Sequence, residues 1–194
     1  ALTINGASKG TFYMNSISGA GGLTMQGSGD TKIQLFGTQS YSGDTIINSA
    51  KIGLNPSVTF ASPRVFLGTN ATFDVGTRTA TLTFSSGQGL TILANASASP
   101  ATIAIASGSG LTMASDSKIV FANYNNANGA PLAVSGAGSL TLASGNSVVV
   151  TNVGTALAAG SYTLISGGGS LVAGTAPATV SVVGNGLGGG LSAS

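Results

Sequence analysis

Residues 18–24 read Ser-Gly-Ala-Gly-Gly-Leu-Thr, and residues 135–141 read Ser-Gly-Ala-Gly-Ser-Leu-Thr. A closely similar sequence, Gly-x-Gly-Leu-Thr, occurs at residues 87–91 and at residues 108–112. In each copy, a glycine-rich turn that tolerates positive backbone φ angles leads into a leucine followed by a β-branched residue. The phrase therefore predicts short strands that are joined by glycine turns and repeated along the chain.

The rest of the sequence shows the same alternation of short strand-like segments and turns. Apolar-alternating segments of a few residues, clearest at residues 79–84, are separated by turns of Gly, Ser, Asn and Ala. No apolar stripe of helical period persists, and an interior glycine would destabilise a helix by about 1 kcal/mol. One all-β domain is predicted over residues 1–194, with strands at residues 2–4, 11–14, 23–25, 32–36, 45–47, 51–54, 58–60, 64–67, 72–75, 79–84, 90–93, 101–105, 111–113, 118–121, 132–134, 140–142, 147–151, 161–165, 170–172 and 178–183.

The spacing of the repeated leucines suggests how the strands are arranged. Leu23, Leu90, Leu111 and Leu140 recur at irregular intervals, the shortest of which runs from Leu90 to Leu111. The two shorter intervals fit units of about 20–30 residues, the size of one β-helix coil. We therefore predict a right-handed parallel β-helix of about nine irregular coils, which would form a rod roughly 40 Å long. A β-sandwich is the alternative, because it also has short strands with frequent turns, although it rarely repeats one phrase.

Charged residues are scarce and scattered. The chain has six Lys or Arg, four Asp, and no Glu, His or Cys, and no charge follows Lys118. Nucleic-acid binding requires a concentrated basic patch, which this distribution lacks. A transmembrane segment is not expected, since no run of about 18 apolar residues occurs. The composition instead suits a hydrogen-bonded β structure, with the seven phenylalanines predicted to stack in its core.

The titratable residues offer little for catalysis. Asp30, Asp44 and Asp74 could align on successive coils, as stacked Asp residues do in enzymatic β-helices, but Asp30, Asp44 and Asp116 are better explained as turn residues. Without His or Cys, neither a Ser–His triad nor a typical metal site is expected. No catalytic residue, cofactor or metal ligand is therefore predicted. Asn70 and Asn95 begin Asn-x-Ser/Thr triplets that fit the glycosylation pattern.

One segment carries a family resemblance. Residues 18–54 contain an ordered set of glycine, leucine, tyrosine, threonine and isoleucine positions, namely Gly19, Gly21, Leu23, Gly27, Gly29, Leu35, Gly37, Tyr41, Gly43, Thr45 and Ile47. With these positions the segment resembles the autotransporter-associated β-strand repeat, found in the passenger regions of bacterial autotransporters. Residues 160–165 resemble the Gly-x-Tyr-x-Leu-Ile phrase near the end of many such passengers. One departure is Ser49-Ala50, where the family often has Ala-Gly. The resemblance implies an extracellular β-solenoid. Secretion is also expected because the first residue, Ala1, is small, as a residue that follows a signal-peptidase cleavage site is.

These observations predict a non-catalytic, secreted structural or adhesive protein. An open solenoid ends in exposed strand edges, and the uncharged last third of the chain has no charge with which to block edge pairing. Head-to-tail self-assembly into a surface filament or matrix fibre is therefore expected, with residues 160–194 as a cap or polymerisation segment. A cell surface or a polysaccharide would be a further partner. The alternatives are a monomeric autotransporter passenger serving as an adhesin stalk, and a polysaccharide-acting β-helix enzyme.

Overall fold

The computed structural model describes residues 1–6, 9–28, 30–95, 99–125, 129–167, 172–177 and 179–189, and none of these lies in a helix. The strands are short because glycine turns interrupt the chain every few residues. They are β1 (Leu2–Gly6), β2 (Gly10–Met14), β3 (Leu23–Gly27), β4 (Thr31–Leu35), β5 (Thr38–Gln39), β6 (Thr45–Asn48), β7 (Lys51–Leu54), β8 (Thr59–Phe60), β9 (Arg64–Leu67), β10 (Thr72–Asp74), β11 (Leu82–Phe84), β12 (Gly89–Ile92), β13 (Ala101–Ala104), β14 (Gly110–Met113), β15 (Lys118–Tyr124), β16 (Leu132–Ser135), β17 (Ser139–Leu142), β18 (Ser147–Asn152), β19 (Ile165–Ser166), β20 (Val172–Gly174) and β21 (Thr179–Gly184).

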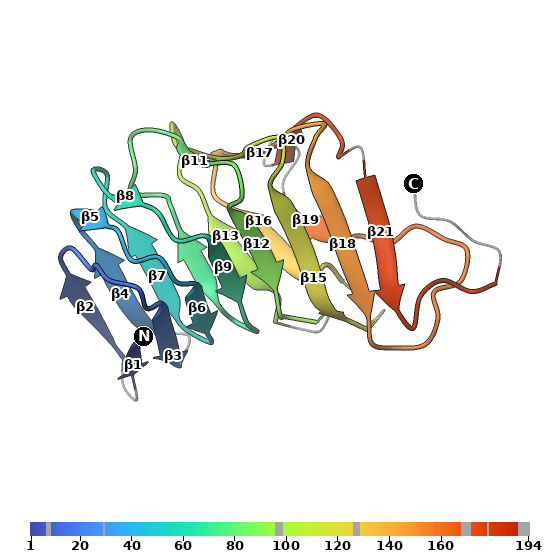
Figure 1. Cartoon of the computed structure of the whole chain (residues 1–194), viewed down its shortest axis with the longest axis horizontal. Coiled ribbons are helices and arrows are strands. Elements are labelled where there is room, and N and C mark those ends of the chain that lie inside the picture. Colours follow the sequence, from blue (N-terminus) through green and yellow to red (C-terminus); the bar gives the residue numbers. More distant parts are fainter. Residues whose placement is uncertain are drawn as a thin grey trace.

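The strands stack into parallel sheets along the long axis of the molecule (Figure 1). Sheet A has the order β1-β3-β6-β9-β12-β15-β18-β21, and sheet B has the order β2-β4-β7-β10-β13-β16-β19. A two-stranded sheet (β5-β8) and then a four-stranded sheet D (β11-β14-β17-β20) form a third side. Because each strand pairs with the equivalent strand of the next coil, the predicted parallel β-solenoid is confirmed and the sandwich alternative is wrong.

The coils widen along the chain. Leu2 pairs with Leu23 at one end and Val148 pairs with Val180 at the other, so the last coil takes up about half as much chain again as the first. Sheet A has eight strands in the described residues, against about nine predicted coils. The larger coils have room for sheet D, which begins at β11.

The repeated Leu-Thr phrase lies on two different sheets. Leu90 belongs to sheet A, but Leu111 belongs to sheet D and pairs with Leu140 one coil later. The interval between Leu90 and Leu111 is therefore only part of a coil. The Leu-Thr sequence occurs in both sheets because the strands of each begin after a turn and place a leucine toward the interior.

Inward-facing positions form continuous apolar columns inside the solenoid. Alternate residues of a strand point to opposite faces, so the same register position faces the interior in every coil. The first inward column of sheet A is Leu2, Leu23, Thr45, Val65, Leu90, Ile119, Val148 and Val180, and the second is Ile4, Met25, Ile47, Leu67, Ile92, Phe121, Val150 and Val182. From Leu23 to Val150 these side chains are buried.

Aromatic rings form a ladder in the middle of this core. Phe60 stacks 6.4 Å from Phe84, and Phe73 lies 5.6 Å from Phe60 and 6.3 Å from Phe84 between ring centroids. Tyr41 meets Phe60 edge-on at 6.4 Å. The predicted stacking of phenylalanines is thus confirmed for these rings. It is wrong for Phe12, Phe36 and Phe66, which lie at an end or on the outside and are not fully buried.

Buried polar side chains join neighbouring coils at the corner that precedes sheet A. Gln88 accepts a hydrogen bond from the Ser85 amide (2.7 Å) and donates to the Ser62 carbonyl of the coil before (2.7 Å). Asn146 accepts from the Ala143 amide (2.7 Å) and donates to the Ser117 carbonyl (3.3 Å). Such neutral bridges satisfy buried backbone groups, so the corners need no charged residues.

Two predicted strands are shorter in the structure. The strand expected at residues 79–84 is only β11, because β11 is the edge of sheet D and residues 79–81 have no neighbouring strand to pair with. The strand expected at residues 161–165 is reduced to β19, since most of that segment lines a cavity instead. The two-residue strand β5 was not predicted. Residues 170, 171 and 178 of the last predicted strands lie outside the described residues.

The Tyr-x-Gly-x-Thr unit of the repeat-like segment has a clear structural role. The Tyr41 hydroxyl lies 2.5 Å from the Thr45 hydroxyl, and both residues are buried. Gly43 is packed so closely that an added Cβ would lie 2.5 Å from the Gly22 nitrogen. The tyrosine hydroxyl thus gives the buried threonine hydroxyl a hydrogen-bond partner. The absence of a side chain at Gly43 lets the backbones of two neighbouring coils come close together. Gly29 of the same segment lies outside the described residues.

Stability is expected to fall at alkaline pH because of Tyr41. Burial raises the pKa of Tyr41 from 10.0 to about 12, against the opposing hydrogen bonds of Thr45 and Ser62. Since the folded pKa lies above the unfolded one, the stabilisation is complete below pH 10 and is lost as the pH rises toward 12. Urea unfolding across this range should show a smaller decline for Tyr41→Phe than for the wild type. An unchanged decline would contradict the assignment, and Tyr13→Phe, at an exposed tyrosine, is the matched control.

Candidate functional site

The end of the solenoid formed by β1 and β2 exposes residues that would be core anywhere else in the fold. Among the described residues, β1 pairs only with β3, and β2 pairs only with β4, so each has one unpaired edge (Figure 1). Leu2 is 38% exposed and Phe12 is 46% exposed, although both occupy inward columns. The partly buried Ile4, Met14 and Ile17 complete an apolar end face.

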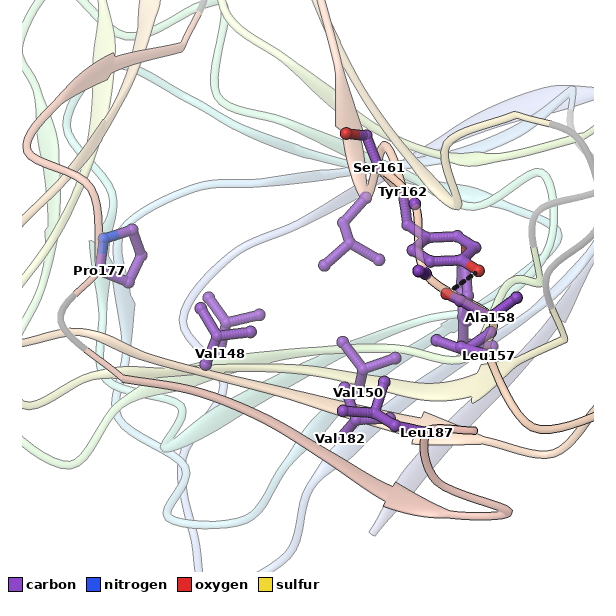
Figure 2. A pocket seen from close by; sticks show the side chains of 14 residues that line it. Val148, Val150, Leu157, Ala158, Ser161, Tyr162, Pro177, Val182 and Leu187 are labelled. Carbon is purple, nitrogen blue, oxygen red and sulfur yellow. Dashed lines mark hydrogen bonds between the residues drawn. The ribbon is translucent and has the colours of Figure 1, made fainter. Parts of the chain in front are cut away.

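The opposite end of the solenoid is hollow. A cavity of about 580 Å³ opens beside β18 and β21 and is lined by apolar side chains (Figure 2). Figure 2 shows Val148, Val150 and Val182 on one side of the cavity and Leu157 and Tyr162 on another. The Tyr162 hydroxyl donates to the Ala158 carbonyl (2.8 Å), and its ring meets Tyr124 edge-on at 6.4 Å, which fixes that wall.

The sheet topology explains why this end is hollow. In the described residues, sheet A has eight strands and sheet B has seven, so β21 has no sheet-B strand following it. Within the described residues, the interior beside Val180 and Val182 therefore has no facing strand of sheet B, which every earlier coil provides. Val180 and Val182 are only partly buried, whereas their column neighbours Val148 and Val150 are buried.

The two ends match in register. Val180 and Val182 of β21 occupy the same inward columns of sheet A as Leu2 and Ile4 of β1. The end at β21 is an apolar hollow, and the end at β1 and β2 presents Leu2 and Phe12. The two faces differ in shape but present the same chemistry at equivalent positions.

Few charges lie near either end. Lys9 and Asp30 form an exposed ion pair (2.9 Å) close to β2 and β4. Beyond Lys118 the sequence has no charged side chain, so none lies on β18, β19 or β21. Edge strands that avoid association commonly present charged side chains, and β21 lacks this protection.

The structure does not bring the aspartates together. Asp44 precedes β6 in sheet A and binds Arg64 through two hydrogen bonds (2.9 and 2.8 Å). Asp74 ends β10 in sheet B, where it contacts Lys32 (3.4 Å) and the Gly76 amide (2.9 Å). Asp30 and Asp116 lie in turns as predicted, whereas Asp44, which was also predicted to be a turn residue, has no assigned turn and lies just before β6. The register therefore gives no column in which Asp30, Asp44 and Asp74 are stacked.

Of the two glycosylation triplets, the one at Asn70 begins in a turn. Asn70 is exposed and has a positive φ of 59°, a conformation that asparagine tolerates. Asn95 ends a described segment, but Ala96 and Ser97 of its triplet lie outside the described residues. Glycosylation of Asn70 or Asn95 stays a prediction from the sequence pattern.

The described residues offer neither a metal centre nor a membrane span. No group of three or more Asp residues is close enough to hold a metal ion there. In the same part of the chain there is no helix long and apolar enough to cross a membrane.

Comparison of the chain with models of protein families, with curated proteins and with solved structures found no match. The resemblance to the autotransporter-associated repeat therefore stays a prediction. The sequence pointed to reactive strand edges at the ends, but it did not reveal the cavity. That feature depends on the different lengths of sheets A and B, which only the register shows.

Proposed function

We propose that this chain is a non-catalytic, secreted structural protein that polymerises head to tail into an extracellular filament or matrix fibre. The main support is the match between the two end faces. Each presents an unpaired strand edge of sheet A, with apolar side chains in the same inward columns.

In the proposed junction, β21 of one copy pairs in parallel with β1 of the next. Continuing the register of sheet A would place Val180 opposite Leu2 and Val182 opposite Ile4. Sheet B would have one strand position empty at the junction. Phe12 of the incoming copy occupies an inward column of sheet B, so in the proposed junction it would lie next to this empty position and enter the cavity beside Val150 and Val182. Burial of each such apolar side chain contributes about 1.5–3 kcal/mol.

The shapes of the ends favour growth over closure. The two faces are different, so their contact is heterologous, and such contacts produce open filaments when the rotation does not close a ring. A head-to-head contact would instead bring two hollow ends or two projecting ends together. Neither arrangement fills the cavity.

Extracellular placement rests on the resemblance of residues 18–54 to passenger repeats and on the scarcity of charge and cysteine. The same resemblance supports the second candidate, a monomeric passenger that serves as an adhesin stalk. The two functions differ in whether the isolated chain assembles.

The test is the state of the purified chain over a range of concentrations. Sedimentation velocity and negative-stain electron microscopy should show unbranched filaments that lengthen with concentration. A chain that stays monomeric at the highest concentrations reached would reject polymerisation and leave the monomeric stalk as the better proposal. Cleavage of polysaccharides above background would reject the non-catalytic part of the proposal.

A further inference from the structure

A second hollow lies on the outer surface of sheet A, far from the two ends. The column that precedes the first inward position runs through Arg64, Gly89 and Lys118 on β9, β12 and β15. Because Gly89 has no side chain, a trough of about 370 Å³ lies between the side chains of Arg64 and Lys118. Thr91 lies in its floor and Val120 lies on the side of Lys118.

The trough is built into the fold. A Cβ added to Gly89 would lie 2.7 Å from the Lys118 carbonyl oxygen, so the backbones approach too closely there for any other residue without a shift. The neighbouring strands are 4.7–4.9 Å apart in a sheet, which places the backbones of Arg64 and Lys118 about 9.6 Å from each other. The distance is comparable to the length of two linked sugar rings.

Each of the two positive side chains beside the trough has at least one donor that makes no hydrogen bond within the described residues. Arg64 donates hydrogen bonds from Nε and Nη2 to the Asp44 carboxylate, and its guanidinium lies 5.5 Å from the centroid of the Phe66 ring. The third nitrogen, Nη1, makes no hydrogen bond within the described residues. Lys118 has no ion-pair or hydrogen-bond partner in the same part of the chain. The carboxylate of Asp116, which also lines the trough, accepts a hydrogen bond from Ser86.

We propose that this trough binds an acidic polysaccharide, with a sugar carboxylate on Lys118 and a neighbouring polar group on Nη1 of Arg64. Asp116 and Thr91 offer hydrogen-bonding atoms to sugar hydroxyls, and Val120 offers an apolar surface to the C–H face of a ring. A nucleic acid fits less well, because the side chains that line the trough include no aromatic ring on which a base could stack. This proposal does not depend on polymerisation, although a filament would repeat the trough along its length and strengthen binding through multivalency.

The test is affinity electrophoresis in gels that contain polygalacturonate or neutral dextran. Wild-type protein and Lys118→Gln are compared with Lys51→Gln, which removes an outward lysine of β7 in sheet B. Thr91→Met fills the trough without changing its charge. Each variant is also made with Phe12→Asp, so that the result is obtained without the proposed assembly.

We expect polygalacturonate, but not dextran, to retard the wild type. Lys118→Gln and Thr91→Met should each weaken this binding about tenfold, equivalent to about 1.4 kcal/mol, while Lys51→Gln leaves it unchanged. Absence of binding would overturn the proposal. It would also be overturned by equal losses in the two lysine variants, by unchanged binding in Thr91→Met, or by equally strong retardation in gels containing single-stranded DNA. Circular dichroism melting confirms that the variants are folded.

Discussion

Phe12→Asp is expected to keep the chain folded but to prevent its polymerisation. Phe12 lies at the end of its column and is 46% exposed, so the substitution creates no cavity within the core of the monomer. In the proposed junction the same position enters the apolar cavity beside Val150 and Val182. Burying an unpaired carboxylate there should weaken association by at least about 3 kcal/mol, which is more than a hundredfold. Sedimentation velocity at matched concentrations measures this loss.

Thr11→Asp is the matched control for that prediction. It introduces the same charge on the same strand, but Thr11 faces outward and pairs with Lys32 on β4. We expect filaments of Thr11→Asp to form nearly as well as those of the wild type. Equal effects of the two substitutions would mean that negative charge at the end, and not entry of Phe12 into the cavity, controls assembly.

Phe73→Ala is expected to produce the largest loss of stability. The Phe73 side chain is fully buried, and its ring contacts those of Phe60 and Phe84 in the aromatic ladder. Truncation of such a residue leaves a cavity and typically costs 3–5 kcal/mol, so we expect a loss of about 4 kcal/mol. Urea unfolding in the Phe12→Asp background measures the free energy of unfolding without a contribution from assembly.

The control for the ladder is Phe66→Ala. Phe66 is a phenylalanine of β9 that faces outward and lies under the Arg64 guanidinium at 5.5 Å. Its truncation removes a partly exposed cation–π contact, for which about 1 kcal/mol is expected. A similar loss for both variants would show that the aromatic ladder is not the main stabilising feature of the core.

The sequence was sufficient to predict the type of fold. The phrases at Leu23, Leu90, Leu111 and Leu140 predict strands that follow glycine turns, and the structure places each of these leucines in a buried inward position. The prediction succeeds because turn chemistry and period-2 alternation are local properties. The scarcity of charge is also explained, since corner residues such as Gln88 bridge coils with neutral hydrogen bonds.

Register could not be predicted, because it depends on how much chain each coil contains. The interval from Leu90 to Leu111 has the length of one coil, yet it crosses from sheet A to sheet D. The trough could not be predicted for the same reason. Gly89 lies between Arg64 and Lys118 only because coils of unequal length are stacked in this register. Likewise, the cavity at β21 follows from sheet B having, within the described residues, one strand fewer than sheet A.

The most direct test of the proposed assembly is the axial repeat of its filaments, measured by helical reconstruction from electron micrographs. The eight strands that sheet A has in the described part of each copy, continued without interruption from β21 to β1, predict a rise of about 38 Å per subunit in a polar filament. A bipolar filament with a repeat near twice this value, or strands that do not run perpendicular to the filament axis, would contradict head-to-tail stacking of the solenoid.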